Sequence, residues 1–282
     1  MIELKINNNF NVLKAENMNY MFKGCKSLKK INNMNYNYIN FSPTNCISME
    51  EMFHSCESLT TLKIGNGNIN CPSLKNVNFM FYGCSSLYSV DLSNIHAIYL
   101  EKMQYMFYNC VNLTNLYLTQ FETNQVSNME YMFYKCSNLT TLSIPKFQFD
   151  NAVQIEYMFY ECNKLPFLNF ENKLNFEKVS DMSHMFHNCY NLSYISKNIT
   201  IKNTPSPNKN LSYMFTNCYS LTDLGFDNSN QNFYVNSLEN MFENCHSLIK
   251  LDISSFRSTI LQNMEKMFKS CYSFTILNIL NL

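Results

Sequence analysis

The 282-residue sequence is poor in glycine, proline and charged side chains, and each shortage excludes a class of protein. Only five glycines and six prolines accompany 23 phenylalanines, so the composition is not that of a disordered chain. Five scattered glycines do not form a phosphate-binding loop. Basic and acidic side chains number 21 each. Without a net positive field we expect no nucleic-acid partner.

Long apolar runs are also missing. No stretch approaches the roughly 20 apolar residues of a membrane-spanning helix, so we expect no membrane insertion. The first residues, MIELKINNNF, lack the basic start and apolar core of a signal peptide. Hydrophobic residues make up 46% of the chain and charged residues only 15%, while the printed sequence contains 45 asparagines. We therefore expect an apolar core beneath a surface of neutral amides and hydroxyls.

The sequence does contain an internal repeat that runs through nearly its whole length. The dipeptide Met-Phe recurs ten times, and a cysteine follows each Phe after three residues. Three residues further stands Leu, or Phe in the last unit. The ten dipeptides start at residues 21, 52, 80, 106, 132, 158, 185, 214, 241 and 267. Ten units in register indicate a repeat architecture.

Each unit changes its hydrophobic period halfway along. Residues 129–136 carry apolar side chains at i, i+3, i+4 and i+7, which predicts a short helix. Ser127 and Glu130 have the spacing of a helix capping box. After the cysteine, apolar residues such as Leu142 and Ile144 alternate, as they do in a half-buried strand.

A turn of helix and a short strand every ~27 residues predict a leucine-rich-repeat solenoid of α/β class. We expect one domain over residues 1–282, with a parallel sheet on the concave face and short helices on the convex face. The repeat units start near residues 18, 49, 77, 103, 129, 155, 182, 211, 238 and 264. Strands are expected near 62–64, 90–92, 116–118, 142–144, 168–170, 224–226 and 251–253.

The pattern M-x-x-M-F-x-x-C-x-x-L-x-x-L-x-L, seen as MEYMFYKCSNLTTLSI at 129–144, resembles a known family. It is similar to the BspA-like leucine-rich repeat surface proteins of bacteria and anaerobic protists, which include the mycoplasma repeat proteins. The resemblance implies a non-enzymatic adhesion or protein-binding role at a cell surface. It transfers no binding residue, because the shared motif belongs to the scaffold.

Ten of the twelve cysteines occupy one repeat position. Their Cβ atoms are expected to point in parallel at the coil spacing of ~4.8 Å or more, which disfavours disulfides. We therefore predict a column of buried, reduced thiols. Replacing Cys136 by Ser should destabilise the fold, whereas Cys46→Ser should be nearly silent. Cys46 and Cys71 lie outside the column and are either exposed thiols or a pair with each other.

The sequence offers little support for chemistry. The best metal candidate is the trio His184, His187 and Cys189, but both histidines stand where preceding units carry Tyr157 and Tyr160. A substitution within a tyrosine column explains them more simply than a metal site. No nucleophile motif, recurring carboxylate pair or cofactor loop is present, so we expect no enzyme activity, metal or cofactor.

Two columns of side chains are candidate binding surfaces. The first lies on the concave face, where residues between the inward strand positions point outward, and its aromatic and amide-rich centre comprises Asn115, Tyr117, Phe167, Asn169 and Tyr194. Isolated surface aromatics are also common without function. The second is a tyrosine ladder on the helix side, which either packs successive helices together or binds a ligand. It comprises Tyr105, Tyr108, Tyr131, Tyr134, Tyr157 and Tyr160.

Two functions remain open from the sequence. The first is a scaffold that binds a protein or glycan ligand in adhesion or another surface interaction. The alternative is a structural subunit that assembles end to end inside a cell or particle. The alternating Ile2, Leu4 and Ile6 predict a capping strand at one end, while Leu277 and Ile279 are expected to lie uncovered at the other. The resemblance favours a cell-surface location, whereas the abundant thiols favour an intracellular one.

Overall fold

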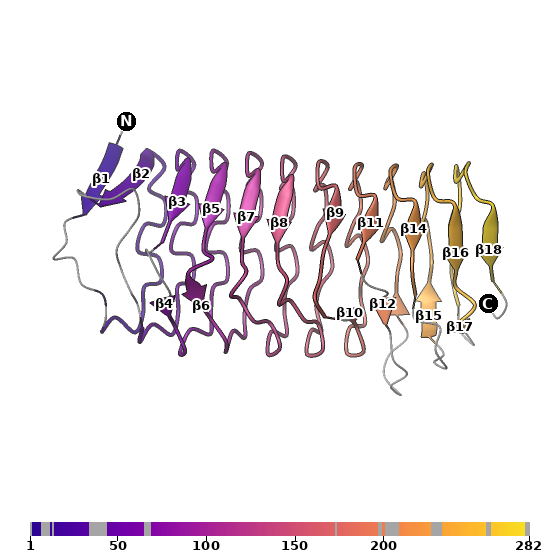
Figure 1. The fold of residues 1–282 in the computed structure, drawn as a ribbon, viewed down its shortest axis with the longest axis horizontal. Helices are drawn as coiled ribbons and strands as arrows, with labels where there is room; N and C mark the ends of the chain where they lie inside the picture. The colour runs from indigo at the N-terminus through magenta and orange to yellow at the C-terminus, as the bar shows by residue number, and fades with distance from the viewer. Residues whose placement is uncertain are drawn as a thin grey trace.

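The computed structural model describes residues 2–6, 12, 14–33, 44–64, 69–172, 174–196, 199–200, 209–226, 233–257 and 261–279. The chain winds through about nine turns of a parallel β-solenoid. Figure 1 shows the coils side by side along a nearly straight axis in that view, with the two termini at opposite ends. The solenoid prediction is confirmed. We call the side with one strand per repeat the strand face; it is the side that the sequence expected to be concave.

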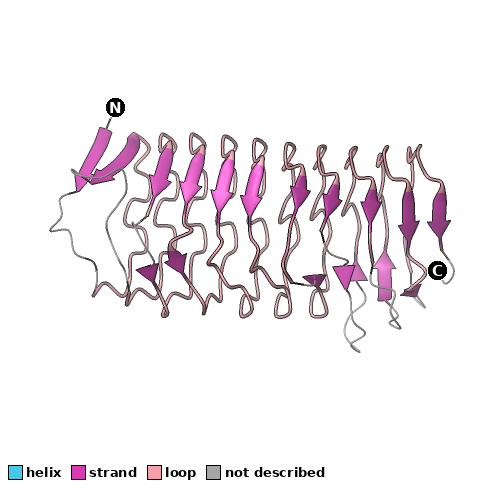
Figure 2. Ribbon diagram, viewed as in Figure 1, coloured by secondary structure: helices cyan, strands magenta, loops and turns pink. Residues whose placement is uncertain are grey.

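Short strands form two rows along the solenoid, one on each long side of the coils (Figures 1 and 2). The strand face has one strand per repeat: β2 (Leu28–Asn33), β3 (Thr61–Lys63), β5 (Ser89–Asp91), β7 (Asn115–Tyr117), β8 (Thr141–Ser143), β9 (Phe167–Leu168), β11 (Tyr194–Ile195), β14 (Asp223–Leu224), β16 (Lys250–Asp252) and β18 (Ile276–Asn278). The opposite row contains β4 (Ile69–Asn70), β6 (Ile95–His96), β10 (Leu174–Asn175), β12 (Ile199–Thr200), β13 (Lys209–Asn210), β15 (Phe233–Ser237) and β17 (Phe256–Arg257). A further strand, β1 (Ile2–Ile6), pairs in parallel with β2 at the N-terminal end, as the alternating residues predicted.

All strand pairs in the described residues are parallel and join equivalent positions of successive coils. Leu62 pairs with Val90, Val90 with Leu116 and Leu116 with Leu142. The observed strands begin one residue earlier than the sequence predicted, because the paired backbone flanks the buried leucine rather than following it. This register points one buried residue of each strand inward and its two neighbours out to solvent.

The strand row is not continuous, because β2 and β3, β8 and β9, and β11 and β14 do not pair with each other. The interruption between β8 and β9 has a cause in the sequence. Four residues after each column cysteine, a backbone N–H donates to the carbonyl of the preceding coil, as Thr140 does to Thr114 and Ser193 does to Pro166. In the β9 coil this position is Pro166, which has no N–H. The proline therefore ends the pairing between β8 and β9.

The expected short helices are absent, since no helix occurs among the residues that the structure describes. The segments around each Met-Phe pair, here called the turn segments, are successive turns instead. The apolar prediction itself is correct, because Met129, Met132, Phe133 and Cys136 are all fully buried. The expected capping box is also wrong in detail, because the oxygen that accepts a hydrogen bond from the Glu130 N–H is Asn128 Oδ1, at 2.9 Å.

Left-handed backbone at two fixed positions of every turn segment explains why no helix forms. The residue before Met and the residue before Cys both have positive φ, and non-glycine residues pay about 1–2 kcal/mol each for this conformation. These positions are Tyr20, Glu51, Phe79, Tyr105, Tyr131, Tyr157, His184, Tyr213, Asn240 and Lys266, and Gly24, Ser55, Gly83, Asn109, Lys135, Glu161, Asn188, Asn217, Asn244 and Ser270.

Backbone hydrogen bonds to the next coil compensate for that strain. In each turn segment alternate N–H groups point along the solenoid axis, and the remaining ones close turns of three residues. Tyr131 N, for example, donates to Glu156 O at 3.1 Å, whereas Tyr134 N donates back to Tyr131 O at 3.2 Å. This pattern repeats along the solenoid and forms a ladder of hydrogen bonds, which we call the turn ladder. A helix would use the same N–H groups within one coil and leave the coils unconnected on this side.

The core between the strand face and the turn ladder is built from columns of identical residues. The ten phenylalanines of the repeat stack ring on ring, with centroids 5.1 to 5.9 Å apart. Offset stacking at these distances is favourable beyond the burial of apolar surface. Since every coil presents the same side chain at the same height, each coil provides a matching surface for the next.

The cysteine column is free of disulfides and largely buried, as predicted, and nine of its ten thiols share one kind of hydrogen bond. Cys136 Sγ donates to Phe107 O at 3.2 Å, and eight other column cysteines contact the preceding phenylalanine carbonyl in the same way. Cys25, in the first coil, is exposed. Cys46 and Cys71 are free and fully buried, so both alternatives drawn from the sequence are wrong. Burial removes the basis for expecting a silent Cys46→Ser substitution.

The left-handed positions predict a substitution effect that depends on backbone alone. Gly83 has φ +70°, and a Cβ there would meet only Ser55 atoms at 3.7 and 3.9 Å, which is ordinary contact. We expect Gly83→Ala to lower the free energy of unfolding by about 1 kcal/mol. Gly83→Asn should cost less, because asparagine tolerates left-handed backbone.

Urea unfolding followed by circular dichroism would measure both changes. Ser86→Ala is the control, since Ser86 lies in the same coil but is not left-handed. Equal stability of Gly83→Ala and Ser86→Ala would contradict the strain that we assign to this position.

Candidate functional site

The five strand-face candidates lie on three strands and do not form one patch. Asn115 and Tyr117 belong to β7 and are separated from the other three by β8. Asn115 is half-buried, and its Nδ2 donates to Thr114 Oγ1 at 2.9 Å. Tyr117 is 38% exposed. The neighbouring coil offers only the small hydroxyl side chains of Thr141 and Ser143 between Tyr117 and the aromatic residues beyond.

Phe167 on β9 and Tyr194 on β11 do contact each other. Their ring centroids are 5.6 Å apart and their planes differ by 11°, and each side chain is 45% exposed. Asn169, two residues beyond Phe167, is exposed in the same coil. We call Phe167, Tyr194 and Asn169 the aromatic patch. Its two rings form an amphipathic surface at low cost in conformational entropy.

Charged side chains flank this region and are paired with each other. Lys63 lies 3.4 Å from Asp91 on the N-terminal side, and Lys250 lies 3.0 Å from Asp223 on the C-terminal side. Between these pairs, the outward positions of β7, β8, β9 and β11 carry amides, hydroxyls and aromatic rings. The centre of the strand face therefore has neither a carboxylate nor an ammonium group to attract a charged ligand.

Sequence reasoning missed the residues at the interruptions of the strand row. Leu142 and Ile195 are partly exposed, while their equivalents in the paired coils, such as Leu116 and Leu168, are fully buried. Pro166 was a visible signal for the interruption between β8 and β9, because it occupies a position where the other coils donate an N–H. No residue type in the sequence predicts that Leu142 and Ile195 are partly exposed.

The tyrosine ladder is a double stack of aromatic rings on the turn side. Each candidate ring lies on its counterpart in the next coil, as Tyr105 does on Tyr131 at 4.8 Å and Tyr131 on Tyr157 at 4.8 Å. The second column stacks in parallel, with Tyr108 on Tyr134 at 4.7 Å and Tyr134 on Tyr160 at 4.8 Å. Both faces of these rings are covered by neighbours, so the ladder presents ring edges to solvent.

The tyrosine ladder stays uncharged at neutral pH. Burial, together with the adjacent tyrosines, raises the pKa of Tyr131 to about 12. Burial also raises the pKa of Tyr160 to about 12, aided by Glu161. The pKa of Glu156, beside the ladder, is raised to about 7 by burial and by its contact with Glu130. These shifts favour the neutral forms that stacking requires.

His184 and His187 continue the two tyrosine columns. The His184 ring stacks on Tyr157 and on Tyr213, both at 4.6 Å, and His187 stacks on Tyr160 at 5.1 Å. The third member of the metal candidate, Cys189, is buried and donates its thiol to Phe159 O. Within the described residues no group of three or more His, Cys, Asp or Glu side chains could hold a metal ion.

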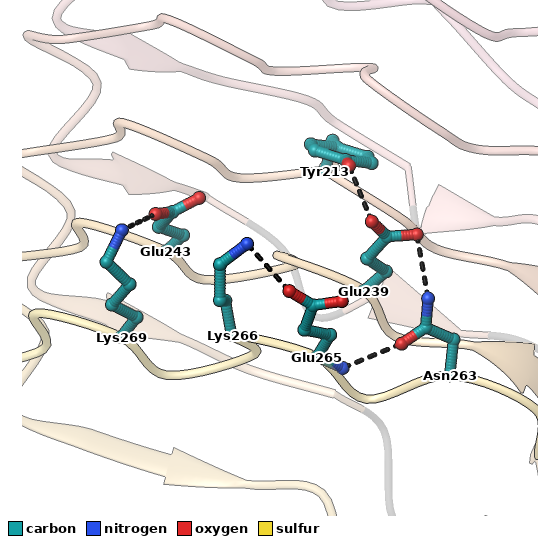
Figure 3. Close-up of polar contacts among 7 residues, drawn as sticks. All are labelled: Tyr213, Glu239, Glu243, Asn263, Glu265, Lys266 and Lys269. Carbon is teal, nitrogen blue, oxygen red and sulfur yellow. Dashed lines mark hydrogen bonds and ion pairs between the residues drawn. The ribbon is translucent and has the colours of Figure 1, made fainter.

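Polar contacts replace the rings at the C-terminal end of the turn side (Figure 3). Tyr213 Oη donates to Glu239 Oε1 at 2.6 Å, and Asn263 Nδ2 donates to Glu239 Oε2 at 2.9 Å. The bond to Glu239 is the main reason that the pKa of Tyr213 rises to about 12. Lys269 pairs with Glu243 at 2.6 Å across the same coils. The aromatic ladder thus ends in contacts that are already satisfied.

His187 predicts a pH dependence of stability. Burial is the main cause that lowers its pKa from 6.5 to about 4, followed by His184. Below pH 6.5 His187 therefore binds a proton in the unfolded chain but stays neutral in the folded chain. The free energy of unfolding falls as the pH drops from 6.5 toward 4. Glu156, whose pKa is raised, acts in the opposite direction over a similar range.

We expect His187→Tyr to gain about 1–3 kcal/mol over the wild type between pH 7 and pH 4.5, because tyrosine keeps the stack without titrating there. Urea unfolding at the two pH values would measure the difference. Tyr160→Phe, in the same column, should show no such gain. A constant difference between His187→Tyr and wild type at both pH values would contradict the prediction.

Solved structures with related folds have low sequence identity to this chain. A leucine-rich repeat protein of T. pallidum shares 18% identity, with 63% of this chain and 72% of that chain covered and a TM-score of 0.42. A leucine-rich repeat protein of Bacteroides ovatus shares 20% identity, with 98% of this chain and 74% of that chain covered and a TM-score of 0.40. A leucine-rich cell surface protein of Faecalibacterium prausnitzii shares 15% identity, with 98% of this chain and 83% of that chain covered and a TM-score of 0.39.

None of the proteins with curated descriptions matches the sequence. No helix in the described part of the chain has the length and hydropathy needed to cross a membrane. A family match covers the repeats in three overlapping segments, residues 3–94, 75–201 and 196–279. This match confirms the resemblance to mycoplasma repeat proteins that residues 129–144 indicated. The chain belongs to the family described as Mycoplasma protein of unknown function, DUF285.

Proposed function

We propose that this protein is a non-enzymatic scaffold that binds a protein or glycan ligand on its strand face, in adhesion or another surface interaction. The observation that carries the proposal is the aromatic patch. Phe167 and Tyr194 are stacked, outward and 45% exposed each on a rigid β-solenoid. Exposed aromatic residues on a fixed backbone lose little entropy on binding and provide large contact areas.

The surroundings of the aromatic patch support a binding role over a purely structural one. The aromatic residues of the turn side stack in long columns that hold successive coils together. The Phe167–Tyr194 pair is only two rings long, with Thr141 and Asp223 at the equivalent positions of the coils on either side. Its outer ring faces are therefore not covered by further aromatic rings. The resemblance drawn from residues 129–144 supports the adhesion part of the proposal.

The double variant Tyr117→Ala, Phe167→Ala tests this function. Immobilised protein would be exposed to a panel of purified serum and extracellular-matrix proteins and to a printed glycan array. We expect the wild type to bind at least one probe and the double variant to bind it at least tenfold more weakly. Both side chains are exposed, so the melting temperature should hardly change.

Tyr99→Ala is the matched control. Tyr99 is 46% exposed but lies beyond β6, away from the strand face. Its removal should leave binding unchanged. Failure of the wild type to bind any probe, or equal binding by the double variant, would overturn the proposed function.

A structural subunit that assembles through end coils is the second candidate. In the described chain β18 pairs with β16 along one edge. Ile276, Leu277 and Ile279 are 55%, 38% and 37% exposed, whereas the residue equivalent to Leu277 in most other coils is buried. A further coil or a second copy of this chain would cover these side chains and extend the parallel pairing.

Sedimentation velocity over a concentration series tests end-to-end assembly. We expect the mean mass to rise with concentration, and the variant Leu277→Lys to reduce this rise by placing a charge in the contact. Val153→Lys is the control, because Val153 is 46% exposed but lies in a central coil, so the added charge should leave the rise unchanged. A single monomeric species at every concentration would exclude this candidate for the 282-residue chain.

A further inference from the structure

The interruption of the strand row between β8 and β9 leaves one backbone carbonyl beside the aromatic patch without its usual hydrogen bond. Along the row, the backbone carbonyl that precedes each strand accepts an N–H from the next coil, and often a hydroxyl as well. Thr114 O, for example, accepts both the N–H of Thr140 and its Oγ1, at 3.0 and 3.1 Å. Thr140 O accepts no hydrogen bond from the described residues, because Pro166 stands where the donor should be.

The stretch where β8 and β9 do not pair, here called the unpaired joint, is short. Leu142 is partly exposed, whereas its equivalents Leu116 and Leu168 are fully buried. The same two coils are joined on the turn side, where Lys135 N donates to Tyr160 O at 2.7 Å, and just beyond the strands, where Glu171 N donates to Pro145 O at 3.1 Å. The loss of pairing is therefore confined to the strands themselves.

The groups beside the unpaired joint are neutral and can form hydrogen bonds. They are the Thr140 carbonyl, the hydroxyl groups of Thr141 and Ser143, the ring of Phe167 and the amide of Asn169. The nearest charges on the strand face are the paired Lys63–Asp91 and Asp223–Lys250. A charged ligand placed here would lose hydration without gaining a partner. A ligand with hydroxyl groups and an apolar face would satisfy both the free carbonyl and the exposed ring.

We propose that the strand face from β8 to β11 binds an uncharged glycan, with a sugar ring against Phe167 and Tyr194 and a sugar hydroxyl donated to the Thr140 carbonyl. This inference rests on the proposed function and narrows its ligand to one class. Sugar rings present C–H groups on one face and hydroxyls at the edge, which match an aromatic ring beside hydrogen-bond acceptors. Asn169, as both donor and acceptor, provides a further contact for a hydroxyl.

Substituting Pro166 tests the role of the Thr140 carbonyl separately from that of the aromatic patch. Pro166→Thr restores the N–H and the hydroxyl that Thr114, Thr140 and Thr222 use in their own coils. We expect the restored N–H to donate to the Thr140 carbonyl, which is then no longer open to a ligand, while every side chain of the aromatic patch remains. Binding of a neutral glycan should then weaken at least fivefold, with thermal stability equal to or above that of the wild type.

The experiment uses the whole chain on a printed array of neutral, sialylated and sulfated glycans. The neutral glycan with the strongest signal is then titrated in solution by calorimetry. Phe167→Ala should weaken its binding at least tenfold, and Tyr88→Ala, an exposed tyrosine two coils before Thr140, should not change it. Raising NaCl from about 0.1 to 0.5 M should leave the affinity unchanged, because no charge pair forms.

The outcomes separate this inference from the proposed function. Binding to a neutral glycan that is weakened by both Phe167→Ala and Pro166→Thr supports the inference. Binding only to charged glycans or to proteins, if lost in Phe167→Ala, overturns the glycan assignment but retains the scaffold function. If Pro166→Thr and wild type bind a neutral glycan equally, the role of the Thr140 carbonyl in binding is overturned. No binding of any probe overturns both.

Discussion

The hydrogen bonds of the turn ladder are the constraint on which the rest of this molecule depends. Each coil directs alternate N–H groups of its turn segment at the carbonyls of the next coil, and it uses left-handed backbone at two positions to do so. With these bonds in place, every residue of one coil stands over its equivalent in the next. The hydrogen bonds thus fix the spacing and register that the strands and the core then share.

Columns of like residues follow from that register. Phenylalanine stacks on phenylalanine, tyrosine on tyrosine or histidine, and the amide of Asn217 donates to Asn188 while that of Asn244 donates to Asn217, both at 2.7 Å. Ion pairs also join successive coils, and Lys75 pairs with Glu101 at the equivalent position one coil on. These surface pairs are exposed and contribute little energy singly. Their effect is to remove unpaired charge from a surface that has few charges to begin with.

The sequence alone revealed the repeat, the buried columns and the starts of seven strands of the strand face to within one residue, because these depend on which side chains are apolar. It did not predict the opposite row of strands. It did not distinguish turns from a helix, because Met129, Met132, Phe133 and Cys136 have helical spacing and yet are buried equally well in a left-handed turn pattern. Glycine or asparagine before the cysteine, as at Gly83 and Asn217, was the available signal. The strand-face candidates were located on the correct strands, but their grouping depended on Pro166, whose effect is felt in the backbone of the neighbouring coil.

The missing N–H of Pro166 also changes the mechanics of the solenoid. Two rows of backbone hydrogen bonds on opposite sides of a rod resist bending in either direction. Between β8 and β9 the strand side has lost its pairing, while the turn ladder on the other side is intact. The strand side therefore holds these two coils together with fewer backbone hydrogen bonds than it does paired coils, although Glu171 N still donates to Pro145 O at 3.1 Å. Resistance to bending on that side thus varies along the rod and follows where the strands pair.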